Sequence, residues 1–109
     1  MANPVPFITG SRAYGRPKPQ SDLDLCVALP AEVIKELRTI SEAPFPKLVF
    51  GKLNLVVFNS DKEEEIERFF RWKEVNDKLI YESLSREVTR EEAVKAFQEG
   101  GAHGNAGDY

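Results

Sequence analysis

The sequence predicts one domain of the α+β class, a small mixed β-sheet with helices packed on it. Its 109 residues suffice for one hydrophobic core. The composition, 41% hydrophobic and 30% charged, is typical of a globular protein. Strand and helix patterns follow in the order strand, strand, helix, strand or hairpin, helix, helix, without the βαβ repeat of a doubly wound sheet. We expect the domain over residues 1–99 and a flexible Gly-rich tail over 100–109.

The first third of the chain predicts two strands joined by a loop. Val5–Thr9 is apolar and ends at a glycine, and residues 12–20 contain two prolines and a glycine, which favours a loop. Residues 21–29 alternate strictly between two kinds of side chain, as expected for a strand. One face carries Leu23, Leu25, Val27 and Leu29, and the other carries Asp22, Asp24, Cys26 and Ala28.

The middle of the chain predicts a helix and then one or two strands. Pro30 suits a helix start, and apolar residues recur at helical spacing over 31–42. Residues 48–50 and 53–58 are strand-like and form either a hairpin or one strand broken near Gly51.

The last part of the chain predicts two helices. Apolar residues recur every three or four positions over 61–84, after a Ser60/Glu63 pair that resembles a capping box. Thr89 and Glu92 form a second such pair, and the helix that follows should stop at Gly100.

Charge, hydropathy and cysteine content exclude several classes of protein. The net charge of −3 argues against a generic nucleic-acid coat, which needs a basic surplus. No apolar run approaches about 18 residues and no signal peptide is evident, so we expect a cytoplasmic protein with no membrane partner. The single Cys26 excludes an internal disulfide framework and is expected to be a small buried side chain.

The residues that carry chemistry lie between Gly10 and Asp24. Asp22 and Asp24 share one face of a strand, about 6.6 Å apart along the backbone, and can hold a divalent ion together. Oxygen ligands without histidine or thiolate favour Mg²⁺ or Mn²⁺, whose shell is completed by substrate phosphates. Gly10 allows the backbone to approach a phosphate closely, and Ser11 adds a hydroxyl donor.

This stretch resembles the nucleotidyltransferases of the DNA polymerase β superfamily, and most closely the minimal nucleotidyltransferases. The family signature is a hydrophobic residue, Gly-Ser, about ten residues, and Asp-hydrophobic-Asp. Here Gly10-Ser11 is followed by ten residues and then Asp22-Leu23-Asp24. The resemblance covers residues 7–25 and is supported by the element order through about residue 58.

The resemblance implies the polymerase β-like fold and transfer of a nucleoside monophosphate from a triphosphate, expected to be ATP, to an acceptor hydroxyl of unknown identity. It implies that Asp22 and Asp24 are catalytic and bind the metal, Mg²⁺ or Mn²⁺. It also implies phosphate binding by Gly10, Ser11, Arg12 and Ser21. Some family members act as antitoxins for a helical protein, so a protein partner or a homo-oligomer is a further expectation.

The chain departs from the family at the third carboxylate. The matching segment is 52–58, and the position that would carry this carboxylate is Asn54, a neutral residue that cannot accept a proton. Three alternatives follow: a weakened enzyme, an enzyme that uses another base, or a non-catalytic module that binds nucleotide or protein. A different alignment of the segment, or an unrelated interaction domain with an accidental motif, would remove Asn54 from the site.

Overall fold

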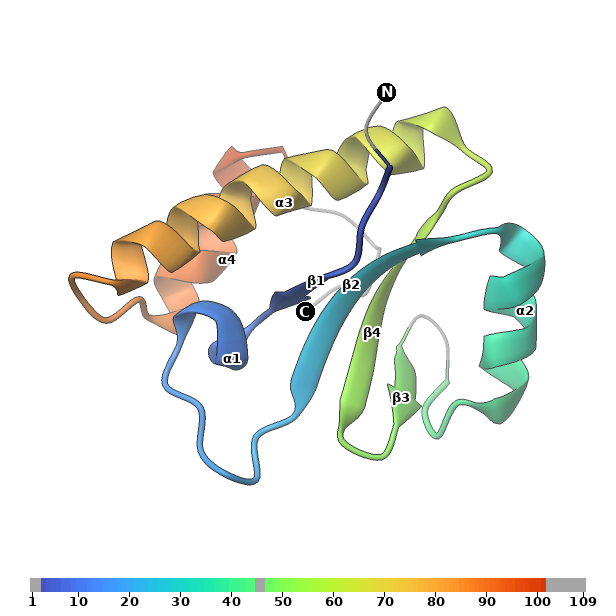
Figure 1. Ribbon diagram of the computed structural model, residues 1–109, viewed down its shortest axis with the longest axis horizontal. Helices are drawn as coiled ribbons and strands as arrows, with labels where there is room; N and C mark the ends of the chain where they lie inside the picture. Colours follow the sequence, from blue (N-terminus) through green and yellow to red (C-terminus); the bar gives the residue numbers. More distant parts are fainter. Residues whose placement is uncertain (1–2, 45–46, 102–109) are drawn as a thin grey trace.

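The computed structural model describes residues 3–44 and 47–101 and confirms the α+β class. The described residues form one four-stranded sheet with helices around it (Figure 1). The strands are β1 (Phe7–Thr9), β2 (Leu23–Leu29), β3 (Leu48–Phe50) and β4 (Leu53–Asn59). The helices are α1 (Ser11–Tyr14), α2 (Ala31–Ile40), α3 (Glu63–Ser83) and α4 (Arg90–Glu99).

The sheet is mixed, in the order β1-β2-β4-β3. β1 runs antiparallel to β2, β2 parallel to β4, and β3 antiparallel to β4. A parallel pair needs a crossover connection, which α2 and β3 provide. The register aligns Thr9 with Asp24 and Asp24 with Asn54, so these three residues form one row across the sheet.

The region around Gly51 forms a hairpin, the first of the two arrangements that the sequence allows. β3 pairs with β4 in antiparallel register, Phe50 opposite Leu53. Gly51 has a φ of 61°, in the left-handed region that favours glycine, and therefore permits the tight turn.

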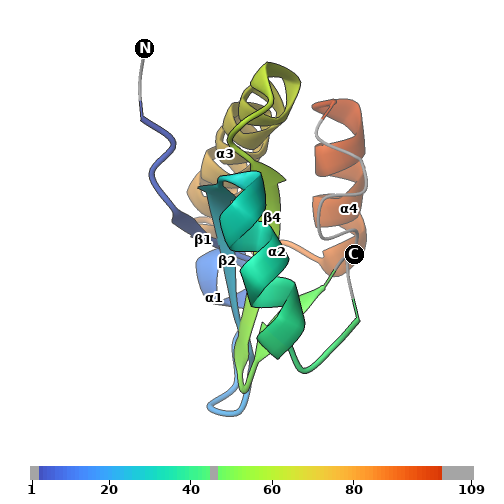
Figure 2. The same ribbon diagram turned by 90° about the vertical axis from the view of Figure 1, so that its right-hand side faces the viewer.

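The hydrophobic core lies on the face of the sheet that carries Cys26, Val56 and Phe58, under α3. Cys26 is completely buried, as expected, and so is Phe58. The Phe58 ring packs edge-on against Phe69 at 5.7 Å and Trp72 at 5.7 Å, both on α3. Edge-to-face aromatic pairs add stability beyond their buried area. In Figures 1 and 2, α3 crosses one end of β2 and β4, and their other ends extend beyond it.

The opposite face of the sheet, which carries the leucines of β2, is only half covered. Leu23, Leu25 and Leu29 are each of intermediate burial, although Val27 on the same face is buried, and α2 contributes no buried residue. The stronger apolar alternation in the sequence thus marks the less buried face. The reason is that the chain packs its larger helix, α3, on the side of Cys26.

Buried polar groups tie α3 to β1. The Thr9 hydroxyl donates to Asn76 Oδ1 at 2.7 Å, and Asn76 Nδ2 donates to the Ile8 carbonyl at 2.9 Å. Thr9 is fully buried and Asn76 nearly so, and burial of such groups is tolerated only when they are hydrogen-bonded. These bonds hold the strand that leads into Gly10 at a fixed position on α3.

Two local expectations are wrong. The loop expected over 12–20 begins with one helical turn, α1, because the main chain turns at Gly10 and the amides of Ala13 and Tyr14 donate to the Gly10 carbonyl. The Ser60/Glu63 capping box does not form: α3 starts after Lys62, with no side-chain cap. The Thr89/Glu92 capping box of α4 is confirmed.

The end of the last helix, α4, can be compared with the sequence prediction. α4 stops at Gly100, as predicted. The remaining part of the expected tail, residues 102–109, lies outside the described residues. Within the described ranges, no helix is both long enough and apolar enough to cross a membrane.

Candidate functional site

The candidate site is a polar cluster at the start of β2 and β4, where the sheet extends beyond α3. Asn54 Nδ2 donates to Asp22 Oδ2 at 3.2 Å and to Asp24 Oδ1 at 3.2 Å. The two carboxylates therefore converge on the Asn54 amide. Asn54 lies beside them, as expected for the position that carries the third carboxylate in the family that the sequence resembles. A cavity of about 450 Å³ opens at this cluster, and Lys47 and Arg90 also line it.

The environment of Asp24 disfavours its charge. Partial burial raises the pKa of Asp24, the hydrogen bond from Asn54 lowers it, and the neighbouring charge of Asp22 raises it again, with a net upward shift. Two carboxylates held this close, with a neutral amide between them, carry negative charge that a divalent cation would neutralise.

Asp24→Asn is expected to stabilise the metal-free protein at pH 7. An aspartate with a raised folded-state pKa prefers the protonated form in the fold, so its ionised form destabilises the protein above that pKa. The difference in the free energy of unfolding between the variant and the wild type should become smaller as the pH falls through the raised pKa of Asp24. Urea unfolding in EDTA from pH 7 to pH 3 measures this difference. A difference that is constant over this range would contradict the assigned shift.

Gly10 places the turn after β1 directly against Asp24. Its φ of 74° and ψ of −158° belong to a region that only glycine adopts readily. A Cβ at this position would lie 2.3 Å from Asp24 Oδ2. The backbone of Gly10 thus touches the carboxylate, so a phosphate beside Gly10 and Ser11 would lie next to a cation held by Asp24.

Arg12 and Ser21 are both predicted to bind phosphate. In the structure they form hydrogen bonds within the loop that connects Gly10 to Asp22. The Arg12 guanidinium donates to the carbonyls of Lys18, Pro19 and Ser21, at 2.8 Å for the shortest bond. The Ser21 hydroxyl accepts from the Lys18 amide at 2.8 Å. The structure therefore brings Gly10, Asp22, Asp24 and Asn54 together. Arg12 and Ser21 instead form hydrogen bonds within the loop that connects Gly10 to Asp22.

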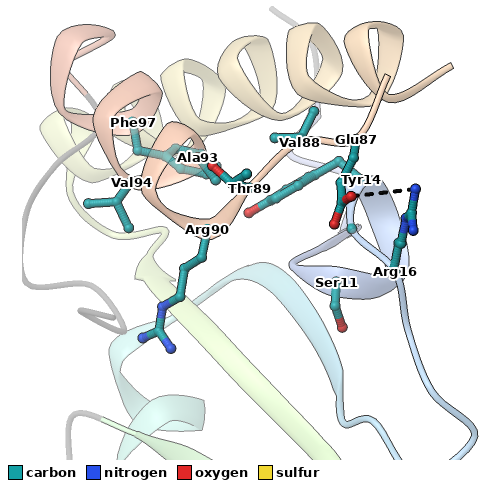
Figure 3. A pocket seen from close by; sticks show the side chains of 11 residues that line it. Ser11, Tyr14, Arg16, Glu87, Val88, Thr89, Arg90, Ala93, Val94 and Phe97 are labelled. Atoms are coloured by element: carbon teal, nitrogen blue, oxygen red, sulfur yellow. Dashed lines mark ion pairs between the residues drawn. The ribbon is translucent and has the colours of Figure 1, made fainter. Parts of the chain in front are cut away.

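Sequence reasoning missed Arg90, which α4 brings to the site from the other end of the chain. Arg90 follows the Thr89 cap and extends from α4 toward the sheet (Figure 3). It lines the cavity of the carboxylate cluster and also a second cavity, between α1 and α4. No motif marks it, because its place depends on how α4 packs against α3.

The cluster fits a magnesium ion better than a metal that needs a full protein cage. Among the described residues, no group of three Asp, Glu, His or Cys side chains could hold a metal. Two converging carboxylates, Asp22 and Asp24, are the usual protein contribution to Mg²⁺ sites that are completed by phosphates. The donor set therefore suits a metal that arrives with a phosphate ligand.

Comparison with known families agrees with this geometry. The family described as "Nucleotidyltransferase domain" matches residues 7–96. The chain belongs to this nucleotidyltransferase family. The match runs from β1 into α4 and therefore spans the whole cluster, including Asn54 and Arg90. No curated protein and no solved structure matches the nucleotidyltransferase domain of this chain.

Proposed function

We propose that this nucleotidyltransferase domain is of the minimal type found in the polymerase β superfamily. It binds a nucleoside triphosphate, ATP by expectation, with Mg²⁺ or Mn²⁺. It transfers the nucleoside monophosphate to an acceptor hydroxyl. The observation that carries the proposal is the convergence of Asp22 and Asp24 directly beside the glycine turn at Gly10.

The reaction forms a bond between the acceptor oxygen and the α-phosphorus and breaks the bond from that phosphorus to the leaving pyrophosphate. Gly10 and Ser11 would hold the phosphates, and Asp22 and Asp24 would hold the cation, with Asn54 Oδ1 as a neutral ligand once its amide turns. The bound cation would neutralise phosphate charge and acidify the acceptor hydroxyl. In-line positioning by these residues supplies much of the remaining rate.

Asn54 makes this a weakened enzyme. A carboxylate at its position could accept the proton of the acceptor hydroxyl, whereas an amide cannot. A positioned general base contributes roughly 10²–10⁴-fold. No other acidic side chain lines the described part of the cavity besides Asp22 and Asp24. We therefore expect slow turnover, with the proton leaving to water.

The second candidate function is a non-catalytic module on the same scaffold, and two observations favour it. Asn54 stands where a carboxylate base would be, and Leu23, Leu25 and Leu29 of β2 are only partly buried. Such a module would bind nucleotide or a helical protein partner, or pair with a second copy, without turnover.

Thermal unfolding with each of the four triphosphates, plus Mg²⁺, Mn²⁺ or EDTA, tests the proposal. A ligand at 100 times its Kd adds about 2.7 kcal/mol, which is several degrees for a domain of this size. We expect a metal-dependent shift in the wild type and none in the Asp22→Ala, Asp24→Ala double variant. No shift with any triphosphate in the wild type would reject the nucleotide site.

A further inference from the structure

We propose that the cavity between α1 and α4 holds the nucleoside portion of the triphosphate, and that Arg90, which lines both this cavity and the carboxylate cavity, contacts its phosphates. The inference rests on the proposed function and deepens it. Helix α4 thereby gains a role in substrate binding, although none of its residues belongs to the Gly-Ser and Asp-Leu-Asp motif.

The cavity has the size and lining of a site for a flat heteroaromatic ring. Its volume is about 410 Å³, within the range of small-molecule sites. Tyr14 on α1 and Val88, Ala93, Val94 and Phe97 from the region of α4 form its apolar wall. Figure 3 shows Tyr14 extending from α1 toward the start of α4.

Polar groups lie at the rim of this cavity. Arg16 and Glu87 form an exposed ion pair of 3.4 Å across its edge, drawn as a dashed line in Figure 3. Thr89 also lines it. An apolar wall with a few polar groups at the edge is the usual arrangement for a ligand that is apolar on its faces and polar at its periphery, as a nucleoside is.

The position of the cavity connects it to the phosphate site. Ser11, the residue after the Gly10 turn, lines it, and Arg90 lines both this cavity and the carboxylate cavity. A nucleotide with its phosphates beside Gly10 and Asp24 can therefore place its nucleoside between α1 and α4.

The charge of Arg90 is available for this role. Within residues 3–44 and 47–101, no hydrogen bond or ion pair engages the Arg90 guanidinium, whereas Arg12 is engaged by loop carbonyls. An uncompensated guanidinium beside a cavity lined by carboxylates suits an anionic ligand that spans the two, and guanidinium forks match phosphate oxygens.

The test compares a nucleotide with its phosphate chain alone. Titration calorimetry measures the binding of ATP and of inorganic tripolyphosphate, each with Mg²⁺, to the full chain and its variants. Val94→Phe, which fills the cavity, should weaken ATP at least tenfold and leave tripolyphosphate unchanged. Arg90→Ala should weaken both ligands about tenfold. Lys95→Ala, a charge-matched change on α4 outside both cavities, should alter neither.

The unmodified protein provides a check that does not depend on variant folding. In ¹⁵N-correlated NMR spectra, the amides of Ala93 and Val94 should shift with ATP and stay in place with tripolyphosphate. Binding of ATP that moves neither amide and is unaffected by Val94→Phe would overturn this inference and leave the proposed function intact. Absence of binding of either ligand to the wild type would overturn both.

Discussion

Asn54→Asp is expected to raise the rate of pyrophosphate release by roughly 10²–10⁴-fold, the usual contribution of a positioned general base. Asn54 lies opposite Asp24 in the parallel register and already touches both carboxylates, so the new carboxylate would complete the cluster. The measurement is release of pyrophosphate from each triphosphate with Mg²⁺, in the presence and absence of added acceptor alcohols.

The matched control is Asn59→Asp, the same substitution on the same strand. Asn59 pairs with Leu29 at the far end of β4, away from the carboxylates, so its replacement should leave the rate unchanged. In EDTA, Asn54→Asp should also lower the melting temperature, because three carboxylates would repel one another, and Mg²⁺ should restore it. An unchanged rate in Asn54→Asp would show that this position does not supply the base, and would favour the non-catalytic module.

Gly10→Ala is expected to abolish metal-dependent nucleotide binding and to destabilise the protein by about 1–3 kcal/mol from backbone strain alone. The added Cβ would lie 2.3 Å from Asp24 Oδ2, so either the turn or the carboxylate must move. Moving either one separates the backbone proposed to bind phosphate from the oxygen proposed to bind the metal. Urea unfolding and the thermal shift with ATP and Mg²⁺ measure the two effects separately.

Gly51→Ala distinguishes strain from the contact with Asp24. Gly51 also has a positive φ, of 61°, but a Cβ there would meet no atom within 4 Å. We expect it to cost about 1–2 kcal/mol, the penalty for the left-handed region, with nucleotide binding retained. Equal loss of binding in both variants would mean that the fold, and not the contact between Gly10 and Asp24, determines binding.

The local sequence predicts those parts of the site that lie on one short stretch. Gly10, Ser11, Asp22 and Asp24 could be proposed as site residues from strand geometry and ligand chemistry, and the structure confirms that Gly10, Asp22 and Asp24 lie together, whereas their binding roles stay predictions. The strand pattern of 53–58, together with the family resemblance, also selects Asn54, and the register confirms that it faces Asp24. These features depend on contacts within a strand pair.

The contacts of Arg12 and the position of Arg90 could not be predicted from the sequence, because both depend on tertiary packing. Arg12 looks like a phosphate ligand in the sequence, yet its planar fork matches three loop carbonyls that only the folded loop presents. Arg90 looks like an ordinary first-turn residue of α4, yet the packing of α4 places it between two cavities. The face of β2 with the more regular leucine pattern is likewise not the core, because the longer aromatic helix covers the other face.

The parallel pairing of β2 with β4 has a consequence for how this protein acquires its site during folding. Asp24 and Asn54 are joined only after the chain has crossed through α2 and β3, which makes the contact non-local and entropically costly to close. A nascent chain that ends before β4 already contains the whole Gly-Ser and Asp-Leu-Asp motif without the strand that aligns it. If Asp22 and Asp24 hold the cation as proposed, we expect a chain that ends before β4 to bind neither the cation nor the nucleotide.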